Sequence, residues 1–356
     1  MFEGRAGLSL DAKIPLPSIF SRYSNRIDVA LRAALDGFNS NIYDTHRYYM
    51  GWTQPDGSLA NAAKGKRLRP TLALLAAEAA GGEIERVMPI AVALEYVHNF
   101  SLIHDDLEDR DRFRHHRPTV WVIWGEPIAI ISGNAMLKIA DGTSKKLVEK
   151  GVAPLIALEI EKNITENYLR MMEGQYLDIR YESIPSISIK QYLDMIEKKT
   201  GALIETSFYS GSLVGPASGP NRALSEHLRS IGYEIGRIFQ IRDDILGVWG
   251  STETGKPVGT DIRRKKKALP IVHVLNSSSP TSKKKIHEIF LQKELSDNDV
   301  DLILEIMESS DTQKYCQSLA NECWERAHTV LNSLELAGET ATYLSELGRF
   351  LLVRES

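Results

Sequence analysis

Apolar residues recur at three- and four-residue intervals along almost the whole chain. This spacing places them on one face of a helix, and it therefore predicts helices. The strict alternation of apolar and polar residues that marks strands is absent. The predicted helical segments cover residues 19–49, 69–80, 84–109, 126–149, 155–180, 188–214, 221–249, 281–292, 297–308, 312–334 and 337–352.

Glycine and proline clusters separate these segments, as turns require. They stand at residues 54–57, 81–82, 215–216 and 219–220. Several segments exceed 20 residues, a length typical of a large helical bundle. We therefore predict an all-α protein with a single domain over residues 1–356, of which 1–18 form an N-terminal extension.

Two acidic pairs each close an apolar helical segment. Asp105 and Asp106 begin a run that ends at Asp109, and Asp243 precedes Asp244. Because a helix turns once every 3.6 residues, Asp105 and Asp109 lie on one face. Ionised carboxylates beside a core are unfavourable unless they are paired or bind metal. A solvated helix end would explain either pair alone, but their repetition favours two metal-binding walls that face one cavity.

Oxygen ligands without cysteine, and with little histidine nearby, are typical of magnesium rather than zinc. Magnesium commonly keeps several waters and binds one or two carboxylates together with phosphate oxygens. The acidic pairs therefore predict a phosphorylated ligand.

The composition narrows the class of protein. Hydrophobic residues make up 43% and charged residues 25% of the chain, as in ordinary globular proteins. The net charge of -4 does not favour a nucleic-acid surface, and no apolar run approaches the ~20 residues of a membrane span. The N-terminal residues lack the apolar core of a signal peptide, and Cys316 and Cys323 have no zinc-site spacing. We expect a cytoplasmic protein.

Clusters of cations accompany the acidic pairs. Residues 65–70 form a basic loop that leads into a helix, where N–H groups favour anions. Residues 198–201 open an apolar helix, and residues 255–261 and 263–267 follow the second acidic pair. The last run alone is compatible with nucleic-acid binding or a localisation tag. Its position beside the acidic pair favours a phosphate clamp, whereas most of residues 110–117 fit a solvated loop.

In this order, the motifs resemble those of the trans-isoprenyl diphosphate synthases, the polyprenyl synthetase family. The similarity covers about residues 20–350. The matching residues are Gly65-Lys66-Arg67-Leu68-Arg69-Pro70, Leu102-Ile103-His104-Asp105-Asp106-Leu107-Glu108-Asp109, Arg114 with Pro118-Thr119, Lys199-Thr200, Phe239-Gln240-Ile241-Arg242-Asp243-Asp244, and Gly255-Lys256-Pro257-Val258-Gly259-Thr260-Asp261 with Lys266. The resemblance implies one large helical bundle of the isoprenoid synthase type around a deep apolar cavity, assembled as a homodimer.

The resemblance also implies a Mg²⁺-dependent prenyltransferase that joins isopentenyl diphosphate to an allylic diphosphate (dimethylallyl, geranyl or farnesyl). Three Mg²⁺ ions would bind the allylic diphosphate through the aspartates Asp105, Asp106, Asp109 and Asp243. The cations that complete this clamp would be Arg114, Lys199, Lys256 and Lys266. Isopentenyl diphosphate would bind opposite, through Gly65, Lys66, Arg69 and His98, with His115 at the position of a family arginine that contacts it. Asp244 is also assigned to substrate binding. Thr200 and Gln240 would direct oxygen dipoles at the allylic cation.

Product length would be set along the helix that carries Asp105. Ser101 is small, and Phe100 is expected to limit the depth of the cavity, with Val97 and Tyr96 one further turn away. In the family, an aromatic residue five positions before the first aspartate accompanies products of medium length. This arrangement favours geranylgeranyl diphosphate, with farnesyl diphosphate close behind, although Phe100 as a simple core residue remains an alternative.

Three positions depart from the family pattern. Gly247 replaces a frequent aspartate, Gly133-Asn134 replaces Gly-Asp, and His115 replaces the second of two arginines. A neutral imidazole offers one donor where arginine offers a charged fork. A class I terpene cyclase, which adds no isopentenyl unit, is therefore an alternative, and a non-catalytic synthase subunit is another. His104-Asp105 also occurs in HD-type metal phosphohydrolases, but the further ordered ligands of that class are missing.

Overall fold

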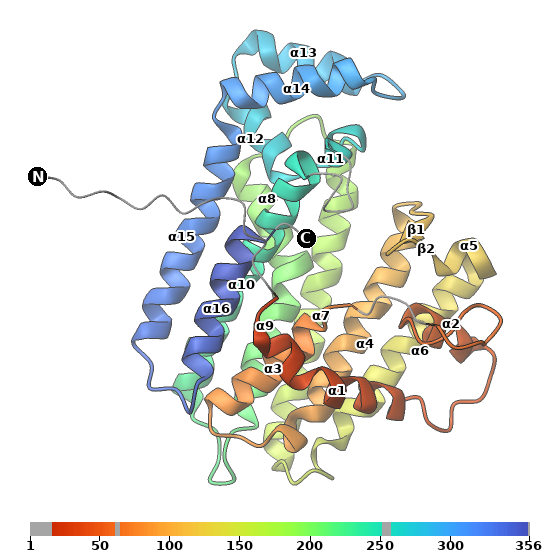
Figure 1. Ribbon diagram of the computed structural model, residues 1–356, viewed down its shortest axis with the longest axis vertical. Helices are drawn as coiled ribbons and strands as arrows, with labels where there is room; N and C mark the ends of the chain where they lie inside the picture. The colour runs from red at the N-terminus through yellow and green to blue at the C-terminus, as the bar shows by residue number, and fades with distance from the viewer. Residues whose placement is uncertain (1–15, 61–64, 251–257, 355–356) are drawn as a thin grey trace, which may run out of the picture.

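The computed structural model describes residues 16–60, 65–250 and 258–354. Long helices whose apolar faces share one core form the centre of the bundle (Figure 1). These are α3 (Leu68–Ala79), α4 (Ile84–Glu108), α6 (Glu126–Ser144), α7 (Pro154–Glu182), α9 (Ala202–Leu213) and α10 (Arg222–Trp249). The prediction of an all-α protein is confirmed.

Shorter elements surround this centre. On one side, α15 (Thr312–Asn332) and α16 (Thr340–Val353) lie side by side and pack on α10 (Figure 1). The other elements are α1 (Ser18–Ala33), α2 (Ile42–Tyr49), β1 (Phe113–Arg114), β2 (Arg117–Pro118), α5 (Val120–Trp124) and the short 3₁₀ turn η1 (Lys145–Leu147). The two-residue strands form an antiparallel hairpin that is too short for its sequence to show alternation.

A second apolar cluster lies at one end of the bundle. Its side chains come mainly from α11 (Thr260–Arg263), α12 (Leu269–Ser277), α13 (Pro280–Phe290) and α14 (Asp297–Ser309). Figure 1 shows α13 and α14 lying across the end of the bundle. Val248 and Trp249 at the end of α10 also contribute to the cluster. The cluster therefore joins α11–α14 to the helix that carries the second acidic pair.

Two predicted helices are interrupted. The predicted segment 19–49 breaks between α1 and α2, where Gly37 has a φ of 84° that a helix cannot include. The segment 188–214 contains α8 (Ile189–Ile196), the π-helical turn η2 (Glu197–Gly201) and then α9. A π turn inserts one residue without ending the helix, so the spacing of apolar residues predicted one helix.

Every helix in the described part of the chain is either too short or too polar to cross a bilayer.

Candidate active site

The first acidic wall is the C-terminal end of α4. Asp105 lies in its last turn and Asp109 caps it, and the Asp109 N–H donates to the Asp105 carbonyl at 2.8 Å. Burial, with the nearby Asp105 carboxylate, raises the pKa of Asp109 to about 6. The two side chains lie on one face of the helix, as predicted, and the ionised form of Asp109 needs a cation.

Lys199 supplies positive charge to this wall from the π-helical turn η2. Its Nζ lies 3.7 Å from Asp105 Oδ1 and donates to Asp178 Oδ2 on α7 at 2.6 Å. A Cβ on Gly174 would overlap the Lys199 backbone, so only glycine lets α7 approach the turn this closely. π turns commonly present functional side chains, and this one aims Lys199 between two carboxylates.

The second wall is α10, where the two adjacent aspartates face different surroundings. Asp243 is one-third exposed and its Oδ1 accepts a hydrogen bond from Arg354 Nη2 at 2.6 Å. Asp244 is buried, with 2% of its surface exposed. Consecutive helix positions point about 100° apart. Asp243 is therefore partly open to solvent, whereas Asp244 is buried, lines a small cavity of the site and lies near the charge of Lys266.

A buried hydrogen-bond chain leads from Asp244 back to the site. Asp244 Oδ2 accepts from the Tyr192 hydroxyl at 2.6 Å and from the Leu269 N–H at 2.7 Å. Asp244 Oδ1 accepts from Gln240 Nε2 at 2.8 Å, and Thr200 Oγ1 donates to Gln240 Oε1 at 2.7 Å. Burial raises the pKa of Asp244 to about 6. The chain fixes Thr200 and Gln240, which the sequence predicted to act together.

Lys266 lies between the two walls. Burial lowers its pKa, but the surrounding carboxylates together raise it above the ordinary lysine value. Those carboxylates are Asp178, Asp244, Asp261 and Asp109. A protonated Lys266 is therefore held beside both acidic walls. Lys256, the other predicted lysine of this segment, lies outside the described residues.

A separate basic group lies near Asp243. Arg69 is buried in the first turn of α3, and burial lowers its pKa to about 10, against the effects of Glu95 and Asp243. Lys66 precedes the helix, and its pKa is lowered by burial and by Arg354. Burial and the neighbouring Arg69 and Arg114 hold the pKa of His98 well below its usual range, so His98 is neutral. The space around Gly65 is open.

Arg114 and Asp106 form an ion pair rather than separate ligands. Arg114 Nε donates to Asp106 Oδ1 at 2.6 Å, and the Tyr49 hydroxyl reaches Asp106 Oδ2 at 3.3 Å. Only 1% of Asp106 is exposed. His115 follows in the turn of the β1–β2 hairpin with a φ of 50°, and its pKa is lowered by burial and by Arg114. Asp106 thus orients Arg114 at the edge of the first wall and does not face the cavity.

The predicted product-length residues separate into two groups. Phe100 is buried and packs against Tyr168 on α7, with ring centroids 5.8 Å apart. The Ser101 hydroxyl donates to the His98 carbonyl at 2.8 Å, and Val97 is buried in the core. Tyr96 is also buried, but its hydroxyl donates to the Leu31 carbonyl at 2.8 Å. Tyr96 therefore faces α1 and is not brought together with Phe100.

The structure accounts for one departure from the family pattern, at Gly247, and shows where a second, at Asn134, lies. A Cβ on Gly133 would overlap the His104 ring, whose Nε2 lies 3.2 Å from the Ile130 carbonyl. Gly133 therefore permits close packing of α4 and α6, while its neighbour Asn134 is exposed. A Cβ on Gly247 would overlap the Asp261 carboxylate, so Asp261 fills the space that a side chain at 247 would use.

Sequence reasoning missed Asp178, Tyr192 and Arg354. Asp178 is largely buried beside Lys199, and although burial raises its pKa, Lys199 and Lys266 bring it below the ordinary value. The signal for Asp178 was a carboxylate within the buried part of a long helix, shortly after Gly174. Tyr192 and Arg354 carried no such signal, because only the fold brings them to α10.

The site fits a divalent cation through its donor chemistry. Asp105, Asp109 and Asp243 offer carboxylate oxygens that are balanced by the cations Lys199, Lys266 and Arg354. No three Asp, Glu, His or Cys side chains in the described ranges converge on one point. Magnesium does not need such a cage, because it completes its shell with waters and phosphate oxygens. The residues present therefore fit Mg²⁺ held jointly with a phosphorylated ligand.

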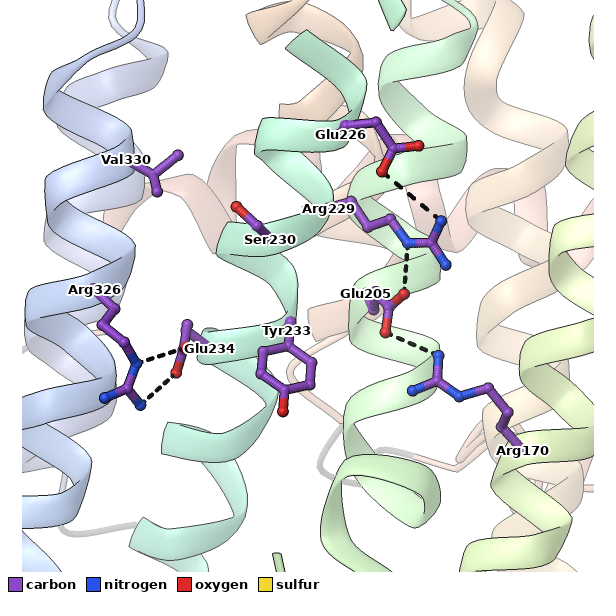
Figure 2. Close-up of a pocket in the computed structure, with 9 residues that line it drawn as sticks. All are labelled: Arg170, Glu205, Glu226, Arg229, Ser230, Tyr233, Glu234, Arg326 and Val330. Atoms are coloured by element: carbon purple, nitrogen blue, oxygen red, sulfur yellow. Dashed lines mark hydrogen bonds and ion pairs between the residues drawn. The ribbon is translucent and has the colours of Figure 1, made fainter. Parts of the chain in front are cut away.

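One small cavity adjoins this region, and a larger cavity lies apart from it. A small cavity of about 30 Å³ is lined by residues of the site, including Asp178, Lys199 and Gln240. A larger one of about 420 Å³ lies among α7, α9, α10 and α15 (Figure 2). Glu205 and Glu234 in the larger cavity pair with arginines (Figure 2). The nitrogen–oxygen distances of these pairs are 2.6 to 3.0 Å. Because the larger cavity contains none of the residues of the acidic walls, we assign the chemistry to the walls.

Comparison with known proteins agrees with the geometry. A family model described as polyprenyl synthetase matches residues 58–307. The (2E,6E)-farnesyl diphosphate synthase of Mycobacterium tuberculosis (strain ATCC 25618 / H37Rv) is 32% identical over 335 residues, which are 93% of this chain and 91% of the relative. The geranylgeranyl diphosphate synthase of the same strain is 36% identical over 250 residues, 70% of this chain and 69% of the relative.

Solved structures share the fold. The polyprenyl synthetase from Streptomyces coelicolor A3(2) gives a TM-score of 0.86 at 30% identity, covering 94% of this chain and 98% of that one. The polyprenyl synthase from Caulobacter crescentus CB15, complexed with calcium and isoprenyl diphosphate, gives a TM-score of 0.79 at 25% identity. The match covers 96% of this chain and 100% of that one. The family uses divalent metal ions and joins isopentenyl diphosphate to allylic diphosphates. The predictions of family and enzyme class are confirmed: the chain belongs to the polyprenyl synthetase family and is a trans-prenyl diphosphate synthase.

Proposed function

We propose that this enzyme condenses isopentenyl diphosphate with an allylic diphosphate and releases geranylgeranyl diphosphate. The observation that supports the proposal is the presence of two separate groups of residues suited to binding anions. One lies between Asp105 and Asp243 with Lys199 and Lys266, and the other comprises Lys66, Arg69 and His98. A terpene cyclase, which ionises one diphosphate and adds no isopentenyl unit, has no use for the second site.

Asp105, Asp109 and Asp243 would hold the divalent ions, of which we propose three Mg²⁺, at the first site. Bound there, Mg²⁺ would supply charge stabilisation for the departing diphosphate. Lys199 and Lys266 would bind diphosphate oxygens, because both ammonium groups are held among carboxylates in the same cavity. Arg114 would be oriented for the same purpose by Asp106. This set of charges favours ionisation of the allylic C–O bond.

The carbon chemistry would follow from the buried groups beneath these charges. Thr200 and Gln240 would stabilise the allylic cation with oxygen dipoles, since their hydrogen bonds hold them in place. The double bond of isopentenyl diphosphate would attack that cation while Lys66 and Arg69 hold its diphosphate. A proton would then leave the new chain for the released diphosphate. The buried surroundings of Phe100 and Val97 exclude the water that would quench the cation.

The exposed faces of α6 and α7 support a homodimer. On α7, the large apolar residues Leu155, Leu158, Leu169 and Tyr176 are each between 55% and 80% exposed. They recur at helical spacing along one face, and Ile130 and Ile131 on α6 are about half exposed. A second copy of the chain would cover these faces. Leu158→Lys combined with Leu169→Lys should halve the mass measured by light scattering, and an unchanged mass would refute this interface.

The test of function is an incubation with Mg²⁺ and farnesyl diphosphate, with and without labelled isopentenyl diphosphate. We expect label in a longer prenyl alcohol after the diphosphate is removed. A cyclic hydrocarbon formed without isopentenyl diphosphate would instead establish a cyclase. No turnover by the purified protein would favour a non-catalytic subunit.

Variants of the acidic walls test the proposed roles. Asp105→Ala and Asp243→Ala should each lower kcat by roughly a thousandfold or more, because each removes a metal ligand. Asp301→Ala removes an exposed aspartate on α14 and serves as the matched control. Circular dichroism should show the same helical content in all three. Retained activity in both wall variants would contradict the metal assignment.

A further inference from the structure

The segment after α16 brings a cation to the second acidic wall. Arg354 is buried, with 6% of its surface exposed, and its Nη2 donates to Asp243 Oδ1 at 2.6 Å and to the Phe239 carbonyl at 3.3 Å. Its guanidinium also lies over the Phe239 ring, 4.6 Å from the centroid. Arg354 thus forms an ion pair with the carboxylate of Asp243, which we propose as the metal ligand on α10.

The backbone at Arg354 is fixed independently of this ion pair. Arg242 Nε donates to the Arg354 carbonyl at 2.9 Å, and Arg242 Nη1 donates to Gln317 Oε1 on α15 at 3.1 Å. The Arg354 N–H donates to the Phe350 carbonyl at 2.8 Å. The segment that carries Arg354 is therefore held by contacts other than the ion pair with Asp243.

A metal ion and the guanidinium compete for the same oxygen. Magnesium coordinates oxygen at about 2.0–2.1 Å, and a positive charge within hydrogen-bond distance of that oxygen opposes it. Asp243 remains about one-third exposed, so its carboxylate is open to solvent. Metal binding through Asp243 Oδ1 therefore requires Arg354 to move.

Arg354 lies near the second basic group, which contains Lys66 and Arg69. Burial and the charge of Arg354 lower the pKa of Lys66, whose Nζ lies 5.7 Å from the centroid of the Phe350 ring, one turn before Arg354. Arg69 and Arg354 each carry a buried Nε–H without a hydrogen-bond partner in the described part of the chain. Unpaired buried donors on neighbouring cations are costly until an anion binds them.

We infer that Arg354 is an exchangeable counter-ion that pairs with Asp243 in the metal-free enzyme and turns to the anion site of Lys66 and Arg69 when metal takes Asp243. This inference rests on the proposed role of Asp243 as a metal ligand. The exchange couples the two sites: metal at the first diphosphate site adds a cation to the second. By linkage, an anion at the second site favours metal at the first.

The test is Mn²⁺ binding to the substrate-free enzyme, measured from the electron paramagnetic resonance signal of unbound Mn²⁺. Arg354→Ala should bind Mn²⁺ about tenfold more tightly than the wild type, because the competing cation is gone. Arg354→Lys keeps the charge and should stay near the wild type. Arg349→Ala removes an exposed arginine from the same helix and should change the affinity less than twofold.

Asp243→Ala separates the inference from the proposed function. If Asp243→Ala weakens Mn²⁺ binding but Arg354→Ala and Arg349→Ala have equal affinities, Asp243 is a ligand and the exchange is refuted. If Asp243→Ala leaves Mn²⁺ binding unchanged, the proposed metal site is wrong and the exchange falls with it. Thermal unfolding of Arg354→Ala checks that α16 stays docked, and Arg354→Gln provides a second neutral variant that keeps most of the side-chain volume.

Discussion

Phe100 on α4 packs against Tyr168 on α7, with ring planes inclined by 49° and centroids 5.8 Å apart. Phe100 also contacts His104 one turn above it, edge to face at 5.1 Å. The two rings therefore join α4 to α7 beneath the acidic wall. In the proposed cavity, a prenyl chain that passed Phe100 would meet Tyr168 next.

This arrangement makes a graded prediction about product length. Phe100→Ala should lengthen the main product by one isoprenoid unit, because it removes the first ring but leaves Tyr168 in place. Phe100→Ala combined with Tyr168→Ala should lengthen it further. The measurement is mass spectrometry of the prenyl alcohols. Tyr96→Phe, which alters a side chain directed at α1, should leave the length unchanged. An unchanged product in the double variant would place the floor elsewhere.

His115→Arg should lower the KM for isopentenyl diphosphate. The pKa of His115 is lowered by burial and by Arg114, so its imidazole is neutral at pH 7, whereas arginine would add a permanent charge. Histidine adopts the φ of 50° found here more readily than arginine, so the exchange should cost some stability. Steady-state kinetics with varied isopentenyl diphosphate gives the answer. His116→Arg, at the adjacent exposed turn position, is the control, and an equal effect there would indicate only a general gain of charge.

Gly174→Ala should destabilise the protein by about 2 kcal/mol and displace Lys199, because the added methyl overlaps the Lys199 backbone. Chemical denaturation gives the free energy of unfolding, and kcat should fall with the displacement of the lysine. Gly142→Ala is the matched control, since a Cβ there has open space within helix α6 and should stabilise by about 0.5–1 kcal/mol. Equal effects at the two glycines would mean that the close contact of α7 with η2 is not important.

Metal binding should weaken below pH 6. The pKa of Asp109 is raised to about 6 by burial and by Asp105, so a proton competes with the metal there. Mn²⁺ affinity should fall by roughly tenfold per pH unit below that value and level off above it. Calorimetric titrations between pH 5 and about pH 8 would measure this, and a flat profile would contradict it.

The same pKa affects stability in the opposite sense when metal is removed. Between the ordinary value of 3.8 and about 6, the folded protein binds a proton at Asp109 that the unfolded chain does not. The free energy of unfolding in EDTA should therefore decrease as pH rises through this window. Asp109→Asn should reduce that slope, although Asp106 and Asp244 have similarly raised pKa values and will retain part of it.

The long helices were predictable because their apolar faces repeat over many turns. The segment expected at 221–249 is α10 at Arg222–Trp249. The π-helical turn and the pairing of Arg354 with Asp243 were not predictable in this way. A π turn shifts the helical phase by one residue without a distinctive composition. Arg354 and Asp243 are far apart in sequence, and only the packing of α16 on α10 brings them together.

The two aspartates of each adjacent pair have different surroundings, as helix geometry requires. Both Asp106 and Asp244 were assigned to the site with their neighbours, and each is buried: Asp106 pairs with Arg114, and Asp244 lines a small cavity beside Lys266. Side chains one residue apart on a helix diverge by about 100°. The two members of each pair therefore have different surroundings, but the sequence alone does not say what the second carboxylate contacts. That depends on Arg114 and Tyr192, which other elements supply.

The chain from Tyr192 through Asp244 and Gln240 to Thr200 also has a fixed direction. An ionised carboxylate only accepts, so Gln240 must turn its amino group to Asp244 and its carbonyl to Thr200. Thr200 then donates its single hydroxyl proton to Gln240. Toward a substrate, the hydroxyl oxygen can act only as a hydrogen-bond acceptor, through its lone pairs. The hydrogen bonds that Tyr192 and the Leu269 amide donate to Asp244 in the core therefore determine that Thr200 acts as an acceptor in the site. Thr200 is an acceptor before any substrate arrives, and no reorientation is needed when positive charge develops beside it.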